Sequence, residues 1–180
     1  SFELGKMLRD GIGCVKNQPD ADRRFKEAFL GFVSLEEKGH DDKLQYRLGQ
    51  MLHTGTGTDK DDAAAMAYFE KSAKLGNANA QYALGKLWLE TGTGDPARAV
   101  AWIRKAAEAG NAAAQYSLAK LYRDGEYVER DIAKAVELFT LAAEQKNDCA
   151  AYALGRLYLA GEEIPKDVEA AIRWLSLSAE

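Results

Sequence analysis

Several residue types are scarce in this chain of 180 residues, and each scarcity excludes a class of protein. The two cysteines, Cys14 and Cys149, are too few for a disulfide framework, so two free thiols are expected. The two histidines, His40 and His53, have no second His or Cys at ligand spacing, and no metal site is predicted. Because no apolar run reaches about 18 residues, no membrane-spanning segment is predicted.

A basic charge balance is also missing. The chain has 24 Lys and Arg against 28 Asp and Glu, which gives a net charge of −4. A general nucleic-acid binder would have an excess of basic residues, so no direct nucleic-acid partner is predicted. The 47% hydrophobic content is ordinary for a folded protein, and three prolines among many alanines favour helix.

Motifs for catalysis or cofactor binding are not supported either. The string TGTG occurs at Thr54–Gly57 and Thr91–Gly94, but no strand precedes it and no phosphate-binding or dinucleotide fingerprint follows. Acidic clusters such as Asp41–Asp42 are typical of helix starts, where the helix dipole favours negative charge. No Ser-His-Asp or Cys-His arrangement is found. We therefore predict that the chain is not an enzyme and that it has no cofactor.

The sequence does contain an internal repeat. A tetrad of an aromatic residue, any residue, Leu, and Gly or Ala begins at Phe2, Tyr46, Tyr82, Tyr116 and Tyr152. The last four copies are spaced 36, 34 and 36 residues, whereas the first gap is 44, which indicates an insertion in the first unit. A second marker, such as AVAWIRKAAEAGN at Ala99–Asn111, keeps the same period. A period in the mid-thirties with two motifs predicts two helices per unit.

Each unit is interpreted as a helical hairpin. Ala80, Leu84, Leu87 and Trp88 follow the spacing of one helical face. The expected N-caps of the second helices are Asp61, Asp95, Asp131 and Asp167, and the expected helix ends include Gly76-Asn77 and Gly110-Asn111. Roughly ten helices are predicted in a single repeat array without a domain boundary, with units of about 1–40, 41–77, 78–111, 112–147 and 148–180.

Glycine recurs at one position of the predicted first helices. The glycines are Gly5, Gly49, Gly85 and Gly155, and Ala119 occupies the same position in the remaining unit. Glycine inside a helix costs about 1 kcal/mol relative to alanine. We interpret the recurrence as a close crossing of the two helices of each hairpin, which a larger side chain would prevent.

The pattern Ala-x-Tyr-x-Leu-Gly-x-x-Tyr, a glycine turn, Asp-x-x-x-Ala-x-x-Trp and Ala-Ala-x-x-Gly-Asn resembles the Sel-one-like repeat family, a relative of the tetratricopeptide repeat. NANAQYALGKLW fits this pattern closely, and the resemblance covers essentially the whole chain, with the first unit departing most. The resemblance implies an all-α fold, a right-handed α-α superhelix or solenoid. It also implies a non-catalytic adaptor for protein–protein interaction, often bacterial. Some secreted relatives clamp each hairpin with a disulfide, and the missing cysteine pairs mildly favour a reducing compartment and a cytoplasmic location.

Two alternative functions remain open. The array could be the accessory repeat tail of a larger bacterial enzyme, such as a conjugative mobilisation relaxase. It could also be a secreted or periplasmic interaction protein. The chain begins inside a first helix at Phe2 and stops where a Gly-Asn pair should follow Ala179-Glu180. We therefore expect a fragment of a longer protein, truncated at both ends.

The resemblance to tetratricopeptide repeats places the first helices on a concave wall and predicts a peptide-binding groove there. The tetrad aromatics form one row, and the residues four positions later, Lys6, Gln50, Lys86, Lys120 and Arg156, form a mostly basic row beside it. An acidic peptide or a C-terminal carboxylate would suit such a face. The candidate groove residues are Tyr46, Gln50, Tyr82, Lys86, Tyr116, Lys120, Tyr152 and Arg156. The alternative is that the tyrosines are packing residues and the cations form a solvated face.

Overall fold

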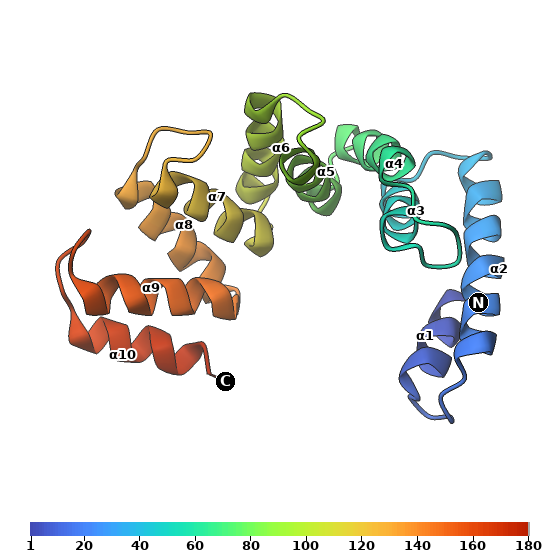
Figure 1. The fold of residues 1–180 in the computed structure, drawn as a ribbon, viewed down its shortest axis with the longest axis horizontal. Coiled ribbons are helices and arrows are strands. Elements are labelled where there is room, and N and C mark those ends of the chain that lie inside the picture. Colours follow the sequence, from blue (N-terminus) through green and yellow to red (C-terminus); the bar gives the residue numbers. More distant parts are fainter. Residues whose placement is uncertain (180) are drawn as a thin grey trace. The chain divides into compact units, whose positions relative to one another are not determined.

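A computed structural model describes residues 1–179 of the chain, and this part forms ten α-helices and no strand (Figure 1). The first helices of the hairpins are α1 (Phe2–Asp10), α3 (Asp42–Thr54), α5 (Ala78–Thr91), α7 (Ala112–Asp124) and α9 (Asp148–Ala160). The second helices are α2 (Gln18–Glu36), α4 (Asp62–Lys74), α6 (Pro96–Glu108), α8 (Ile132–Glu144) and α10 (Val168–Leu177). The predicted all-α class is confirmed.

The chain divides into two compact units, of which the first spans Ser1–Ala80 and the second begins at Gln81. In the first unit, α1 packs on α2 and α3 packs on α4. In the second, α7 packs on α8 and α9 on α10, and contacts of α6 with α7 and of α8 with α9 join successive hairpins. The single uninterrupted array with the unit boundaries given above stays a prediction.

Polar caps define where the helices begin. The four predicted N-caps are confirmed, because each side chain accepts a hydrogen bond from a backbone N–H in the first turn; they are Asp61, Asp95, Asp131 and Asp167. Asn77 and Asn111 were expected only to mark helix ends. Their side chains also accept hydrogen bonds from the N–H groups of Ala80 and Ala114, at 3.0 and 2.9 Å, at the start of the next helices. Each Gly-Asn pair, Gly76-Asn77 and Gly110-Asn111, therefore ends one hairpin and begins the next.

The recurrent glycines lie where the two helices of a hairpin cross closely. A Cβ atom added to Gly49 would lie 2.6 Å from the ring of Phe69 on α4. One added to Gly85 would lie 2.6 Å from the backbone oxygen of Ala99 on α6. Real Cβ atoms essentially never approach so closely, so the predicted close crossing is confirmed.

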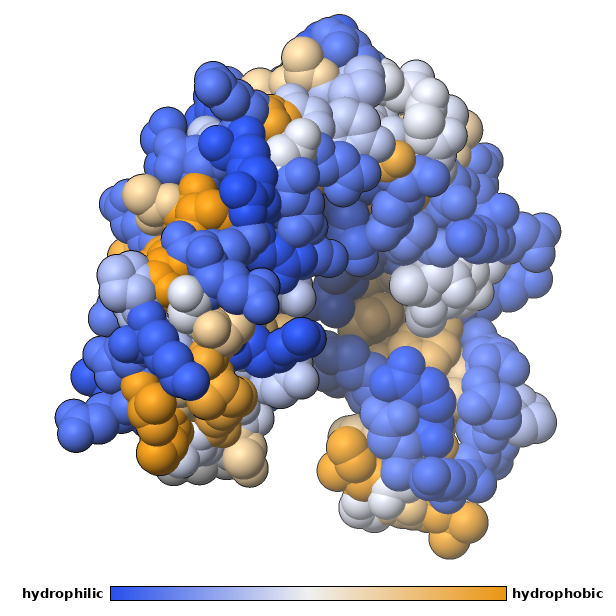
Figure 2. Space-filling model, turned by 60° about the vertical axis from the view of Figure 1, so that its left-hand side comes forward, coloured by the Kyte–Doolittle hydropathy of each residue, from blue (hydrophilic) through white to orange (hydrophobic). Residues whose placement is uncertain are grey.

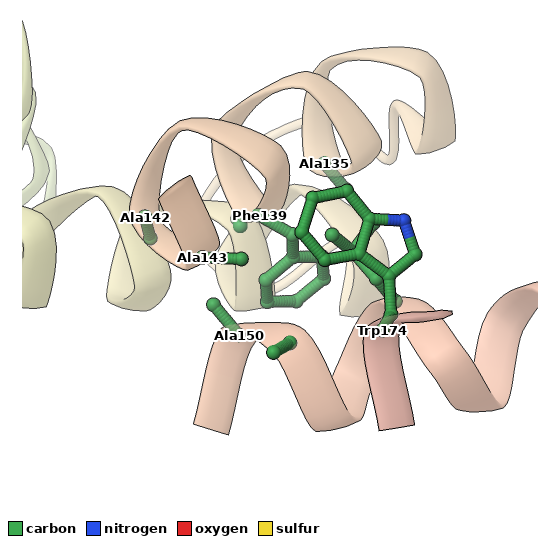
Figure 3. Packing of buried hydrophobic residues seen from close by; sticks show 9 residues of the cluster. Ala135, Phe139, Ala142, Ala143, Ala150 and Trp174 are labelled. Carbon is green, nitrogen blue, oxygen red and sulfur yellow. The ribbon is translucent and has the colours of Figure 1, made fainter. Parts of the chain in front are cut away.

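The core of the second unit runs through successive hairpins. One cluster joins α6 to α7 through side chains that include Ile103 and Leu118. A second cluster joins α7, α8, α9 and α10 around Phe139, which is fully buried, with Trp174 reaching in from α10 (Figure 3). Helix α7 contributes to both clusters, so a hairpin completes its core only by packing on its neighbours.

The outer surface is mostly hydrophilic on the side that Figure 2 shows, with hydrophobic side chains gathered in small patches. Among the helices within residues 1–179, none combines the length and the apolarity needed to cross a bilayer.

Candidate functional site

Three first helices of the second unit each carry a tyrosine and a cation one helical turn apart. The pairs are Tyr82 and Lys86 on α5, Tyr116 and Lys120 on α7, and Tyr152 and Arg156 on α9. The Lys120 Nζ atom lies 6.0 Å from the Tyr116 ring centroid, and the Arg156 guanidinium carbon lies 5.9 Å from that of Tyr152. At these distances each cation is attracted to the face of its ring. We call these six residues the first-helix face.

A hollow of about 460 Å³ lies between α5 and α7. Tyr82, Tyr116, Lys86 and Lys120 line it, together with apolar side chains that include Ile103. The Tyr82 and Ser117 hydroxyl oxygens lie 3.0 Å apart and join α5 to α7. Two of the predicted pairs therefore share one cavity, the α5–α7 hollow.

A second hollow, of about 530 Å³, lies between α7 and α9. Tyr116, Tyr152 and Arg156 line it, and so does the thiol-bearing Cys149. Tyr116 borders both hollows, so they adjoin along one side of α7. The structure thus brings six of the eight predicted groove residues to one continuous, indented face.

The cations of this face differ in how far they are already paired. Lys86 Nζ lies 3.5 Å from the Glu90 carboxylate on the next turn of α5. Lys120 and Arg156 are exposed and form no ion pair with any residue in the part of the chain that the structure describes. These two side chains are the charges most available to an anionic ligand.

The ends of α5 and α7 and the turns after α7 and α9 add carboxylates that the predicted rows of tyrosines and cations did not include. Glu90, Asp124 and Glu126 line the α5–α7 hollow, and Glu162 and Glu163 line the α7–α9 hollow. The face is therefore mixed in charge rather than mostly basic. The acidic residues are visible in and beside the turn strings of the sequence. Their position beside the hollows could not be predicted, because residues 30 or more apart meet only through the stacking of hairpins.

Two of these carboxylates are neutralised by arginines. Arg123 binds Asp124 through two hydrogen bonds of 2.7 and 3.0 Å, and these hold the pKa of Asp124 below its ordinary value. Arg130 Nη2 donates to Glu163, while Arg130 Nε donates to the Arg123 backbone oxygen at 2.9 Å. The network ties the turn after α7 to the turn after α9.

The remaining predicted groove residues, Tyr46 and Gln50, lie on α3 in the first unit. Gln50 Nε2 donates to the Tyr46 hydroxyl at 2.9 Å, and the Tyr46 ring packs 5.8 Å from Phe69. Burial raises the pKa of Tyr46. Tyr116 packs on Phe139 at the same 5.8 Å spacing, whereas Tyr152 is 52% exposed. Tyr46 is therefore a packing residue. Tyr116 both packs on the core and lines the two hollows, and the exposed Tyr152 is not a packing residue.

Both histidines have carboxylate neighbours. His53 Nδ1 lies 2.6 Å from Asp62 Oδ1, a hydrogen bond that lowers the pKa of Asp62. His40 Nδ1 lies 3.2 Å from Glu36 Oε1. Within residues 1–179, no group of three or more potential ligands could hold a metal ion. Cys14 and Cys149 are free and exposed.

Glu36 is a buried carboxylate where α2 ends, and sequence reasoning did not single it out. Gln45 Nε2 on α3 donates to it at 3.0 Å, and Lys71 Nζ on α4 lies 3.9 Å away. The hydrogen bond from Gln45, with help from His40 and Lys71, holds the pKa of Glu36 below its ordinary value despite the opposing effect of burial. This carboxylate links two successive hairpins.

We predict that Glu36 makes stability depend on acidity. Because the pKa of Glu36 is lower in the folded state, its carboxylate stabilises the fold at pH values above the unfolded-state pKa of about 4.3. This stabilisation is lost as the pH falls through the folded-state pKa. Glu36→Gln should lower the free energy of unfolding by about 1 kcal/mol at pH 7 and flatten its decline below about pH 5. Urea unfolding followed by circular dichroism between pH 7 and pH 3 checks this, with the exposed Glu37→Gln as control. Parallel pH curves for Glu36→Gln and the unsubstituted chain would contradict it.

Comparison with known proteins agrees with the repeat. The family model described as Sel1 repeat matches residues 1–21, 43–77, 78–111, 112–147 and 150–180. A Sel1 repeat protein from Oxalobacter formigenes is 30% identical over 98% of this chain and 70% of its own, with a TM-score of 0.81. A protective antigen present in uropathogenic Escherichia coli strains, which displays an SLR fold, is 27% identical over 99% of this chain and 44% of its own, with a TM-score of 0.60.

An immunity protein from Pseudomonas aeruginosa, 21% identical over 96% of this chain and 85% of its own, has a TM-score of 0.50 and shows the fold alone. The helical-repeat solenoid class and the resemblance drawn from the tetrads are both confirmed by these matches. With five family matches along its length, this chain belongs to the Sel1 repeat family.

Proposed function

We propose that this chain is a non-catalytic scaffold that holds a partner protein or peptide on the first-helix face of α5, α7 and α9. Sel1 repeat proteins generally serve as scaffolds for protein–protein interaction and are typically non-catalytic. The observation that supports this face is the pair of adjoining hollows lined by tyrosines and by the unpaired cations Lys120 and Arg156. We take this to be the concave face of the second unit.

The chemistry of the face suits an extended segment that carries carboxylates, either side chains or a C-terminus. Tyrosine rings offer large contact area with little loss of side-chain freedom, and each has a polar hydroxyl for a hydrogen bond. Exposed cations at the edge of an interface attract an anionic partner and set its register. Asp124 and Glu163, which arginines already neutralise, oppose such a partner less than free carboxylates would.

The test is a charge reversal with a matched control. Lys86→Glu, Lys120→Glu and Arg156→Glu are combined in one variant, and the probe is a fluorescein-labelled hexaglutamate peptide with a free or an amidated C-terminus. Fluorescence anisotropy at low salt should show binding weakened by about tenfold or more, because attraction becomes repulsion. A larger loss with the free C-terminus would indicate carboxylate capture.

The control variant reverses three exposed cations of the second helices in the same unit, Arg98, Lys105 and Arg173. It changes net charge equally, so binding within about twofold of the unsubstituted chain is expected if the first-helix face is the site. Equal losses in both variants would mean that only net charge matters. Circular dichroism checks that both variants remain helical. We also propose a cytoplasmic location, which suits the two exposed free thiols.

A further inference from the structure

The turn after α7 holds a tyrosine in a backbone conformation that suits glycine. Tyr127 has φ of 60°, in the left-handed region, which bulky side chains rarely adopt. Gly13 and Gly57 occupy the same place in the turns after α1 and α3, two residues beyond the glycine that ends each helix, with φ of 73° and 76°. Glycine would therefore serve this turn at least as well as tyrosine does.

The Tyr127 side chain is not buried in a core that would explain its presence. It is 50% exposed and lines the α5–α7 hollow together with Tyr82 and Tyr116. Strained residues cluster at binding and active sites. Tyr127 therefore adds a third aromatic ring to the α5–α7 hollow, which Tyr82 and Tyr116 already line.

The lining of the α5–α7 hollow is partly apolar and partly charged. Leu89, Ile103 and Leu121 contribute apolar side chains, of which Ile103 is 2% and Leu121 9% exposed. Lys86 and Lys120 line the same space, and so do the carboxylates of Glu90, Asp124 and Glu126. Glu90 is paired with Lys86 and Asp124 with Arg123, whereas Lys120 forms no ion pair among the described residues. A cavity of about 460 Å³ with aromatic walls suits one large apolar side chain, and Lys120 suits a carboxylate beside that side chain.

We propose that the α5–α7 hollow accepts one aromatic side chain of the bound acidic segment and that Tyr127 is kept, despite its strained backbone, as the wall that grips it. This inference rests on the proposed function and adds to it the class of residue that the partner must present. It makes Tyr127 a specificity-determining residue of the face. A partner with carboxylates alone would leave the hollow empty and would bind more weakly.

The chain supplies a matched control for backbone strain. Lys146 has φ of 63° at the place where Gly76 and Gly110 follow α4 and α6. It lines a separate hollow with Ala143 and Asn147. Tyr127→Gly and Lys146→Gly should both raise the melting temperature, by about 2–4 °C each, because both relieve a left-handed non-glycine residue. Only Tyr127→Gly should change binding.

The probes are two fluorescein-labelled pentapeptides, Glu-Glu-Trp-Glu-Glu and Glu-Glu-Ala-Glu-Glu, measured by anisotropy at low salt. The unsubstituted chain should bind the tryptophan peptide about tenfold more tightly, the effect of one well-packed aromatic anchor. Tyr127→Gly should reduce that ratio to about twofold or less while leaving affinity for the alanine peptide unchanged, and Lys146→Gly should keep it. Tyr127→Asn, a residue that tolerates left-handed backbone, repeats the test without glycine flexibility.

The outcomes separate this inference from the proposed function. Equal binding of the two peptides, or a preference for tryptophan that persists in both Tyr127 variants, overturns the proposal that the α5–α7 hollow accepts an aromatic side chain. The proposed binding of an acidic segment to the first-helix face is not affected by that result. A lower melting temperature for Tyr127→Gly overturns the argument from strain. If neither peptide binds, the proposed function of this face is overturned, and so is the proposal for the α5–α7 hollow.

Discussion

Gly85→Leu is expected to lower the stability of the second unit strongly. A Cβ atom at this position would already lie 2.6 Å from the Ala99 backbone oxygen and 2.7 Å from Ile103 Cγ1. Backbone cannot swing aside as a flexible side chain can, so a leucine would have to push α5 and α6 apart. Overpacking typically costs about 1–3 kcal/mol, and a branched side chain against backbone should cost about 3 kcal/mol or more. The measurement is the free energy of unfolding in urea, followed by circular dichroism.

The repeat supplies a comparison for this substitution. Ala119 occupies the corresponding place on α7 and is fully buried, so the crossing of α7 and α8 accommodates a methyl group. At α5 and α6 the Ala99 backbone oxygen leaves no such room, so Gly85→Ala should destabilise the chain despite the helix preference for alanine, which is worth about 1 kcal/mol. Ala119→Gly should lower the free energy of unfolding by about 1 kcal/mol through helix preference, and further through the lost packing of one methyl group. An unchanged urea midpoint for Gly85→Leu would show that α5 and α6 do not cross closely.

Phe139→Ala is expected to be nearly as damaging. Phe139 is fully buried and lies among small alanines of α8 and α9, with Trp174 of α10 beside it (Figure 3). Its ring also packs on Tyr116, 5.8 Å away. Truncating a buried phenylalanine removes apolar contact and leaves a cavity, which typically costs about 3–5 kcal/mol. Because the alanines around it are short, they cannot fill the space.

The control for Phe139→Ala is Leu141→Ala on the same helix, where the leucine is 41% exposed. It should cost about 1 kcal/mol or less, because little buried apolar area is lost. Both variants are measured in urea, with hydrogen exchange of α9 and α10 as a second readout. If Phe139→Ala were no more damaging than Leu141→Ala, the cluster would not be the core of these hairpins.

The glycines, the tetrads and the capping aspartates predicted the helices and their pairing because these signals are local. A cap acts within three residues, and one helical face is defined by residues three or four apart. The same local spacing placed each tyrosine one turn before its cation. Asp61 and Gly85 therefore behave as the sequence indicated, the first as a cap and the second as a close crossing.

What only the tertiary structure decided was which distant residues share a cavity. Arg130 and Glu163 are 33 residues apart, and Gln45 reaches Glu36 across a turn between hairpins. Such pairs depend on how one hairpin stacks on the next, and no local spacing records that geometry. The conformation of Tyr127 belongs to the same class, because a turn string shows its residues but not their backbone angles. The sequence by itself determined the repeating hairpin, and the stacking of hairpins determined the charge and the shape of the face between them.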